Sequence, residues 1–443
     1  MSAIAIREIG EIIRKNRKEK GFRLEDLADE NISSATISNV ERGIPYVSLD
    51  KVQYLLAKLG IEMDKLPSLL MDEQRENKDL EFKLFAIETM RDAFGNTDDL
   101  LKELNGLELE DSHPYAATVW YLKGRCYCQN RLWDKAERAL SNGIRLSKQH
   151  PYGEKSNIEA ACFTELGLCS YHQNNLETAL KFTESGLDAF QTEGDRKFIQ
   201  YKLLRNKAVY LERLGRLNEA LQVVQDTWDY LSEIQPVSVV LSLYCLRADL
   251  SVKTGLYQEA IEIAKDGLKI AQFDQRYGHL FDLWAILGSA YIKLMEWSIA
   301  EYCFRMALKL KDKPIHQHSL IDAYTRLGLM YLKQERWEEA REVIEKAVEN
   351  GKKLNHVPWL INAYISLGDY YRLQGGDQQA ISSYQNAYDL AYANQLRYKE
   401  QTILLRLAKC WEKIDEQEFQ RCMRNIYKVQ EKISEEDDFL ENL

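Results

Sequence analysis

The chain has few prolines and no long run of apolar residues. Only 7 prolines occur among 443 residues, which is typical of a mostly helical chain because proline interrupts helix interiors. The longest apolar stretch, around residues 237–246, is shorter than the roughly 20 residues that a membrane-spanning helix needs. Residues 1–15 carry charges every few positions and lack the apolar segment of a secretory signal. We therefore expect a cytoplasmic protein.

Sequence motifs of catalysis and of metal binding are missing as well. The chain contains no P-loop, no dinucleotide fingerprint, no H-E-x-x-H and no G-x-S-x-G. Its 8 cysteines form no C-x-x-C pair, which favours buried free thiols over zinc ligands or disulfides. His316 and His318 form an H-x-H pair, but no cysteine or carboxylate cluster stands beside it, so a metal site there is disfavoured. We expect no enzymatic activity, no metal and no cofactor.

The net charge of −10 is unevenly distributed along the chain. Residues 1–71 hold eleven basic and eleven acidic side chains, whereas the remainder holds 48 basic and 58 acidic ones. All of the excess negative charge therefore lies after residue 71. An acidic region of this kind is a poor general binder of nucleic acids.

Two amphipathic helical patterns stand back to back in residues 320–348. In each pattern the apolar residues recur at helical spacing and so share one face of a helix. Gly328 and Ala340 lie at the centres of the two faces, where small residues let helix backbones approach closely. A helical hairpin of this kind is the tetratricopeptide (TPR) unit.

Further copies of the hairpin lie before and after this one. From Ala220 onward the small residue of the second helix recurs every 40 residues, compared with about 34 in ordinary TPR units. One hairpin cannot bury its own apolar face, so stacked copies are needed. We therefore expect an all-α fold with a right-handed TPR superhelix over residues 112–443, closed by polar capping helices. The recurring alanines are Ala136, Ala179, Ala220, Ala260, Ala300, Ala340 and Ala380.

The N-terminal region, residues 1–71, has a different pattern. It predicts helices over residues 6–20, 24–30, 35–42 and 49–59, with Ser34 and Ser48 as caps of the last two. The order resembles the helix-turn-helix of the Cro/repressor (Xre) class, and its specific marks are Leu27-Ala28, Ile37-Ser38, Glu41 and Gly43. Residues 72–111 read as a degenerate hairpin or connector.

This resemblance implies a recognition helix that enters the major groove of DNA. Its first residues would reach base edges, and an asparagine there can bind adenine. Arg17 would pair with Glu41 rather than contact DNA, as the corresponding residues do in the repressor class. The domain is neutral overall, so a dimer would be needed for useful affinity. The candidate DNA-binding residues are Ser34, Ala35, Thr36, Asn39 and Arg42.

The first helices of the repeats would line the concave wall of the superhelix. Their polar positions mix amides with charges of both signs, which suits an extended peptide: amides pair with its backbone and arginines with carboxylates. The candidate positions are Arg125, Arg205, Asn206, Asp249, Lys253, Asp282, Asp322, Arg326, Asn362 and Asp369.

A DNA reader followed by a TPR superhelix resembles the peptide-responsive quorum-sensing regulators of the Rgg–Rap–NprR–PlcR–PrgX group, with a length and repeat count most similar to the NprR type. The resemblance implies a transcription regulator that binds an operator, responds to a short signalling peptide and forms a homodimer through its repeats. Asn206 and Arg125 match the family's peptide-holding positions best. Two alternatives stay open: a Rap-like adaptor that binds or dephosphorylates a response regulator, and a lysogeny switch of a phage or mobile element.

Overall fold

The computed structural model describes residues 3–43, 48–93, 97–149, 155–273, 275–354 and 356–441. Within these ranges the secondary structure is helical, apart from one isolated bridge between Asp29 and Ile32. The protein is thus all-α with TPR-like superhelical repeats, which confirms the fold class that the sequence predicts. The chain divides into two compact units, residues 1–165 and 166–443, and the boundary falls inside α10 (Ile158–His172).

The first unit begins with four short helices packed around one apolar core. Ile13, Ile37 and Leu55 are fully buried at the centre of this core. The helix expected to stop at Gly21 does so, because Gly21 adopts a left-handed backbone (φ +75°) that L side chains rarely accept. The helices are α1 (Ala3–Glu19), α2 (Leu24–Leu27), α3 (Ser34–Glu41) and α4 (Leu49–Lys58).

Two local details differ from the sequence prediction. The second helix ends at Leu27 rather than residue 30 because the Asp29 carboxylate accepts the backbone N–H groups of Asn31 and Ile32, at 2.8 and 3.1 Å, and so forms a turn. The cap of α3 is Ser33 rather than Ser34. Its hydroxyl oxygen accepts the backbone N–H of Thr36 at 3.1 Å, so α3 starts one residue earlier than expected.

A single long helix follows the four short ones. Helix α5 (Leu66–Ala93) runs across residues 71 and 72, where the sequence places a domain boundary. It packs against α1 near its start, and it also contacts α7 (Ala116–Gln129). The unit is completed by α6 (Asp98–Gly106) and by α8 (Trp133–Ser147), which forms a hairpin with α7.

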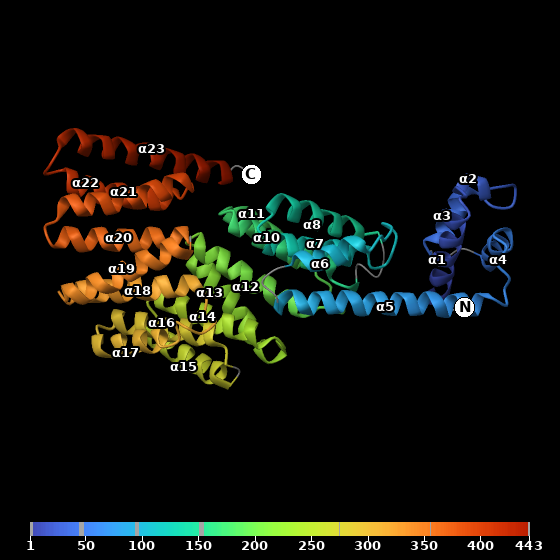
Figure 1. The fold of residues 1–443 in the computed structure, drawn as a ribbon, viewed down its shortest axis with the longest axis horizontal. Coiled ribbons are helices and arrows are strands. Elements are labelled where there is room, and N and C mark those ends of the chain that lie inside the picture. Colours follow the sequence, from blue (N-terminus) through green and yellow to red (C-terminus); the bar gives the residue numbers. More distant parts are fainter. Residues whose placement is uncertain are drawn as a thin grey trace. The chain divides into compact units, whose positions relative to one another are not determined.

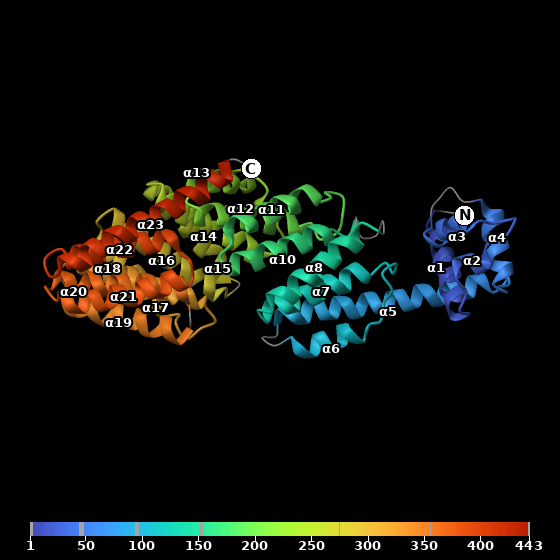
Figure 2. The ribbon, with the colours of Figure 1, turned by 90° about the horizontal axis from the view of Figure 1, so that it is seen from above.

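The second unit is a stack of helical hairpins (Figures 1 and 2). From α12 onward each first helix packs on the second helix that follows it, α11 packs on α12, and successive first helices from α12 to α20 also pack on one another. The first helices are α12 (Phe198–Arg213), α14 (Val237–Lys253), α16 (Tyr277–Lys293), α18 (Gln317–Lys333), α20 (Val357–Leu373) and α22 (Arg397–Trp411). The second helices are α11 (Leu176–Ala189), α13 (Leu217–Trp228), α15 (Tyr257–Phe273), α17 (Trp297–Leu308), α19 (Trp337–Leu354), α21 (Asp377–Ala393) and α23 (Glu416–Glu441).

Several first helices carry a glycine at the same position of the repeat, and this glycine faces a bulky residue of the second helix. A Cβ on Gly328 would lie 2.4 Å from Cγ1 of Ile344, and one on Gly368 would lie 2.3 Å from the Tyr384 ring. In both hairpins the bulky partner stands 16 residues after the glycine. The glycine therefore makes room for a large side chain, while the alanine of the sequence pattern, such as Ala340, is buried beside it.

The last hairpin, which the sequence predicts to be a polar cap, carries several exposed apolar side chains. On α22, Tyr398 and Leu405 are 66% and 46% exposed, and on α23 Tyr427 is 65% exposed.

Candidate functional site

Helix α3 presents the residues that the sequence assigns to base reading. Ala35 and Arg42 are exposed, and Ser34, Thr36 and Asn39 are half-buried. Nη2 of Arg42 donates to Oδ1 of Asn39 at 2.7 Å. The side chains of Asn39 and Arg42 thus contact each other at the end of α3.

The predicted ion pair between Arg17 and Glu41 is confirmed. It is bidentate, with Nε–Oε1 at 2.6 Å and Nη2–Oε2 at 3.0 Å, and both residues are buried. Nη1 of Arg17 also donates to the carbonyl oxygen of Phe22 at 2.7 Å. The hydrogen bonding of Arg17 to Glu41 is the main cause that raises the pKa of Arg17. Helix α1 is thereby fixed to the end of α3.

The other cations of α1 are largely engaged within the first unit. Arg14 and Lys18 both reach Glu110, at 3.4 and 2.5 Å. Lys15 reaches Glu76 on α5 at 2.7 Å. Helix α1 is therefore not a free basic surface, and its charges hold the four-helix core to the helices that follow.

Arg125 lies in the first unit and is only 4% exposed. Its guanidinium pairs with Glu165 at 3.1 Å and with Glu88 at 3.5 Å, and it sits over the ring of Tyr121. The sequence predicts that Arg125 contacts a peptide, but in this structure its guanidinium is already paired with Glu88 and Glu165.

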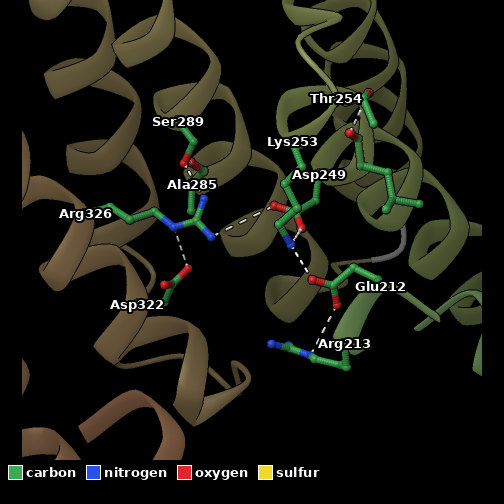
Figure 3. Close-up of polar contacts among 10 residues, drawn as sticks. Glu212, Arg213, Asp249, Lys253, Thr254, Ala285, Ser289, Asp322 and Arg326 are labelled. Atoms are coloured by element: carbon green, nitrogen blue, oxygen red, sulfur yellow. Dashed lines mark hydrogen bonds and ion pairs between the residues drawn. The ribbon is translucent and has the colours of Figure 1, made fainter. Parts of the chain in front are cut away.

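The second candidate site is a charged network on the first helices of the second unit (Figure 3). Lys253 Nζ lies 2.6 Å from Glu212 and also pairs with Asp249 on its own helix. We define the charged network as Glu212, Arg213, Asp249, Lys253, Asp322 and Arg326. It spans α12, α14 and α18, so it links repeats that are not neighbours in sequence.

Arg326 is the hub of this network. Its Nε lies 2.8 Å from Asp322, one turn away on α18, and its Nη2 lies 3.9 Å from Asp249 on α14. Its Nη1 donates to the Ser289 hydroxyl of α16 at 2.7 Å. One guanidinium thus contacts three successive first helices, as Figure 3 shows.

Opposite charges set the protonation states in the network. Burial alone would raise the pKa of Asp249, but Lys253 and Arg326 outweigh burial and the pKa lies below its usual value. Asp322 is the main cause that raises the pKa of Arg326. Asp249 and Arg326 therefore stay charged at neutral pH.

The remaining predicted positions lie beside the network in smaller pairs. Arg205 donates from Nε to the amide oxygen of the buried Asn206 at 3.1 Å. Asp282 accepts from Nδ1 of His316 at 2.8 Å. Two further pairs are Asn362 with Lys399, at 2.6 Å, and Asp369 with Arg406, at 3.3 Å.

Four histidines form a row near the starts of successive first helices; the sequence analysis singled out His316 and His318 but not the row. The rings of His279, His316, His318 and His356 follow one another with centroids 5.6, 5.8 and 6.1 Å apart, and His318 lies 4.7 Å from the ring of Trp359. Burial lowers the pKa of His279 and of His318 to about 4, whereas the hydrogen bond that His316 donates to Asp282 raises the pKa of His316.

Some of the site residues that the sequence analysis missed could have been predicted from the 40-residue repeat. His279, Trp359 and Lys399 differ by multiples of 40, and so do Arg213 and Lys253. Equivalent positions of successive first helices point the same way, so a column of cations or rings marks a shared face.

In the described part of the chain, no helix is both long and apolar enough to cross a membrane. No group of three or more histidine, cysteine or acidic side chains there is arranged to hold a metal ion.

Residues 319–393 match the model of the tetratricopeptide repeat. No curated protein matches the sequence. Among solved structures, a Rap protein complexed with the competence and sporulation factor is 14% identical, with 81% of this chain and 99% of that chain covered and a TM-score of 0.59. The apo form of the quorum sensor NprR from B. thuringiensis is 18% identical, with coverages of 80% and 99% and a TM-score of 0.58.

NprR in complex with its cognate peptide NprX is likewise 18% identical, with the same coverages and a TM-score of 0.53. These likenesses extend over nearly the full length of the other chains. At such low identity they show that the fold is shared.

Proposed function

We propose that this chain is a transcription regulator that binds operator DNA through α3 and is switched by a short signalling peptide on the first helices of its second unit. One observation carries the proposal: an N-terminal helical core held by the buried Arg17–Glu41 pair is followed along the chain by a TPR array whose polar side chains connect non-adjacent repeats. The solved NprR and Rap structures with bound peptide or factor support it at the level of the fold.

The DNA-binding role rests on the surface of α3. Ser34, Ala35, Thr36 and Asn39 would face base edges, and Arg42 would face phosphate. The balanced charge of residues 1–71 means that sequence-specific contacts and pairing of two copies would have to supply most of the affinity.

The peptide-binding role rests on the charged network and the pairs beside it. Asn206 and Asn362 would bind peptide backbone groups, and Arg205 and Arg326 would bind carboxyl or carbonyl oxygens. Asp249 and Asp322 already have cationic partners, and Asp282 accepts a hydrogen bond from His316, so a basic peptide group would have to replace those partners. We do not assign Arg125 to the peptide, because Glu88 and Glu165 hold it.

A homodimer would form through the exposed apolar residues of the last hairpin, among them Tyr398, Leu405 and Tyr427. Such a dimer would place two helix-turn-helix domains on one duplex. Replacement of Leu405 by glutamate should shift the sedimentation coefficient to that of a monomer, while Lys409→Glu on the same helix should leave it unchanged.

The function is tested by two selections on the full chain. The protein is first incubated with a pool of random-sequence duplex DNA, and retained sequences are amplified and reselected. The proposal predicts that one sequence becomes enriched, and that the Asn39→Ala variant fails to enrich it. Random heptapeptides are then offered to the protein, and captured peptides are identified by mass spectrometry.

A second function, that of an adaptor for a response regulator, is favoured by a specific feature of α5. Phe82 and Phe85 are 69% and 61% exposed one turn apart on this helix, and exposed aromatic side chains are typical of protein-binding surfaces. If no DNA sequence is enriched, and a response regulator of the host binds wild-type protein but not the Phe82→Ser variant, the adaptor function replaces the regulator.

A further inference from the structure

Trp359, in the first turn of α20, forms a contact with a residue from a distant repeat. The guanidinium carbon of Arg213, the last residue of α12, lies 5.5 Å from the centroid of the Trp359 ring. The His318 ring lies 4.7 Å from the same ring. The α12 and α20 helices belong to hairpins that are separated by three others.

Among the described residues, the ion pair that Arg213 forms is with Glu212. Its Nε lies 3.3 Å from Glu212, its neighbour in sequence, and 44% of its side chain is accessible. In Figure 3 the end of this guanidinium extends away from Glu212, and no dashed line leaves its terminal nitrogens. The two terminal nitrogens form the planar fork that matches a carboxylate.

Lys399 lies on α22, the first helix of the last hairpin, and contacts the same part of α20. Its ammonium donates to the amide oxygen of Asn362 at 2.6 Å. Asn362 follows Trp359 by three residues, so the two side chains are neighbours on the surface of α20. Arg213 and Lys399 therefore approach one short stretch of α20 from opposite ends of the array.

Among the described residues, no carboxylate forms an ion pair with Lys399. In the charged network, three cations already meet three carboxylates. Burial is the main cause that lowers the pKa of Lys399, and the positive charge of Arg213 lowers it further, while the negative charge of Asp322 offsets part of this effect. A cation in this position is costly unless an anion compensates it.

We propose that Arg213 and Lys399 together bind a carboxylate of the peptide, with Trp359 as the wall against which the adjoining residue packs. This inference rests on the proposed peptide-binding function of the same helices. The carboxylate is either the peptide's C-terminus or an Asp or Glu side chain, since both offer two oxygens to an arginine fork. Its binding connects α12 to α22 and thereby fixes the separation of the two ends of the array.

Three libraries of random heptapeptides test this proposal against the immobilised full chain. The first has a free C-terminal carboxylate and no Asp or Glu. The second is C-terminally amidated and contains Asp and Glu. The third is amidated and lacks Asp and Glu, so it offers no carboxylate at all. Captured peptides are quantified by mass spectrometry.

The wild-type chain should retain peptides of the first or the second library, and the library retained tells which carboxylate is bound. Arg213→Gln and Lys399→Gln should each lower that capture at least about tenfold. Arg341→Gln is the matched control, because Arg341 forms an exposed pair with Glu345 on a second helix. Arg213→Lys and Lys399→Arg keep the charge and should retain more binding than the glutamine variants, which separates charge from folding.

Equal capture of the third library would overturn the carboxylate site and leave the peptide-binding function standing. Unchanged capture by both glutamine variants would also overturn it. If no library is captured, both the proposed peptide-binding function and this inference are wrong.

Discussion

The Arg17 guanidinium and the Glu41 carboxylate face each other with Nε–Oε1 at 2.6 Å and Nη2–Oε2 at 3.0 Å, and both residues are 7% exposed. Removal of one buried partner leaves the other charge uncompensated. Glu41→Gln should therefore lower the local stability of α1 and α3 by at least about 1 kcal/mol. Amide hydrogen exchange of these two helices in the full chain measures the effect.

Glu62→Gln serves as the control for that variant, since Glu62 and its partner Lys65 are both well exposed. An exposed pair contributes about 0–1 kcal/mol, so exchange should change little. Equal protection of α1 and α3 in wild type and Glu41→Gln would contradict the stabilising role of the buried pair.

Asn39 and Arg42 should respond differently when they are replaced by alanine. A base contact contributes roughly 1–3 kcal/mol of discrimination, so Asn39→Ala should weaken the selected DNA and leave random DNA unaffected. Arg42→Ala should weaken both and reduce the salt dependence, as loss of a phosphate contact does. Fluorescence anisotropy at several salt concentrations distinguishes the two; an equal loss on both DNAs for Asn39→Ala would refute base reading.

Gly328 should not tolerate even one added methyl group. Its Cβ would overlap Cγ1 of Ile344 at 2.4 Å, and overpacking of this kind costs about 1–3 kcal/mol. Gly328→Ala should lower the melting temperature of the second unit, whereas Gly106→Ala, where a Cβ meets nothing within 4 Å, should be neutral. A melting temperature unchanged by Gly328→Ala would show that the hairpin adjusts freely.

This glycine illustrates how much of the fold the sequence predicts. The recurrence of Gly328 and Ala340 identifies the hairpins, since close helix packing requires small residues at fixed spacing. The pattern does not reveal that Ile344 fills the space, because pairing across two helices depends on their crossing angle. The shortened α2 has a similar origin: its end depends on Asp29, whose side chain competes with the helix for backbone N–H groups.

The candidate site was predictable only in part. Asp249, Asp322 and Arg326 were found because polar residues between apolar helix positions must face away from the core. Which of them meet depends on the stacking of non-adjacent repeats, so the Arg326–Asp249 contact was not visible in the sequence. Trp359 and Arg213 were missed because each resembles an ordinary helix-end residue until α12 and α20 come together.

The histidine row makes the second unit sensitive to acid. In the folded protein the pKa values of His279 and His318 lie at about 4, below their usual 6.5, so the unfolded chain binds more protons between these values. Stability should therefore fall as the pH drops from about 6.5 towards 4. His316, whose pKa is raised by Asp282, acts in the opposite direction and stabilises the fold only while it is protonated.

Thermal melts between neutral and mildly acidic pH test this account. The double variant His279→Gln and His318→Gln should lose less stability on acidification than the wild type, while His113→Gln in the first unit serves as the control. Parallel pH profiles of the double variant and the wild type would contradict the role of the two histidines.

Coupling between the two units is the central claim, and one titration tests it most directly. The affinity of the full chain for its selected DNA is measured by anisotropy with and without a saturating heptapeptide from the capture experiment. A coupling of about 1–3 kcal/mol predicts that the dissociation constant changes roughly 5- to 150-fold, and that Arg326→Gln abolishes this change while basal DNA binding persists. An identical dissociation constant with and without a peptide that demonstrably binds would contradict the claim.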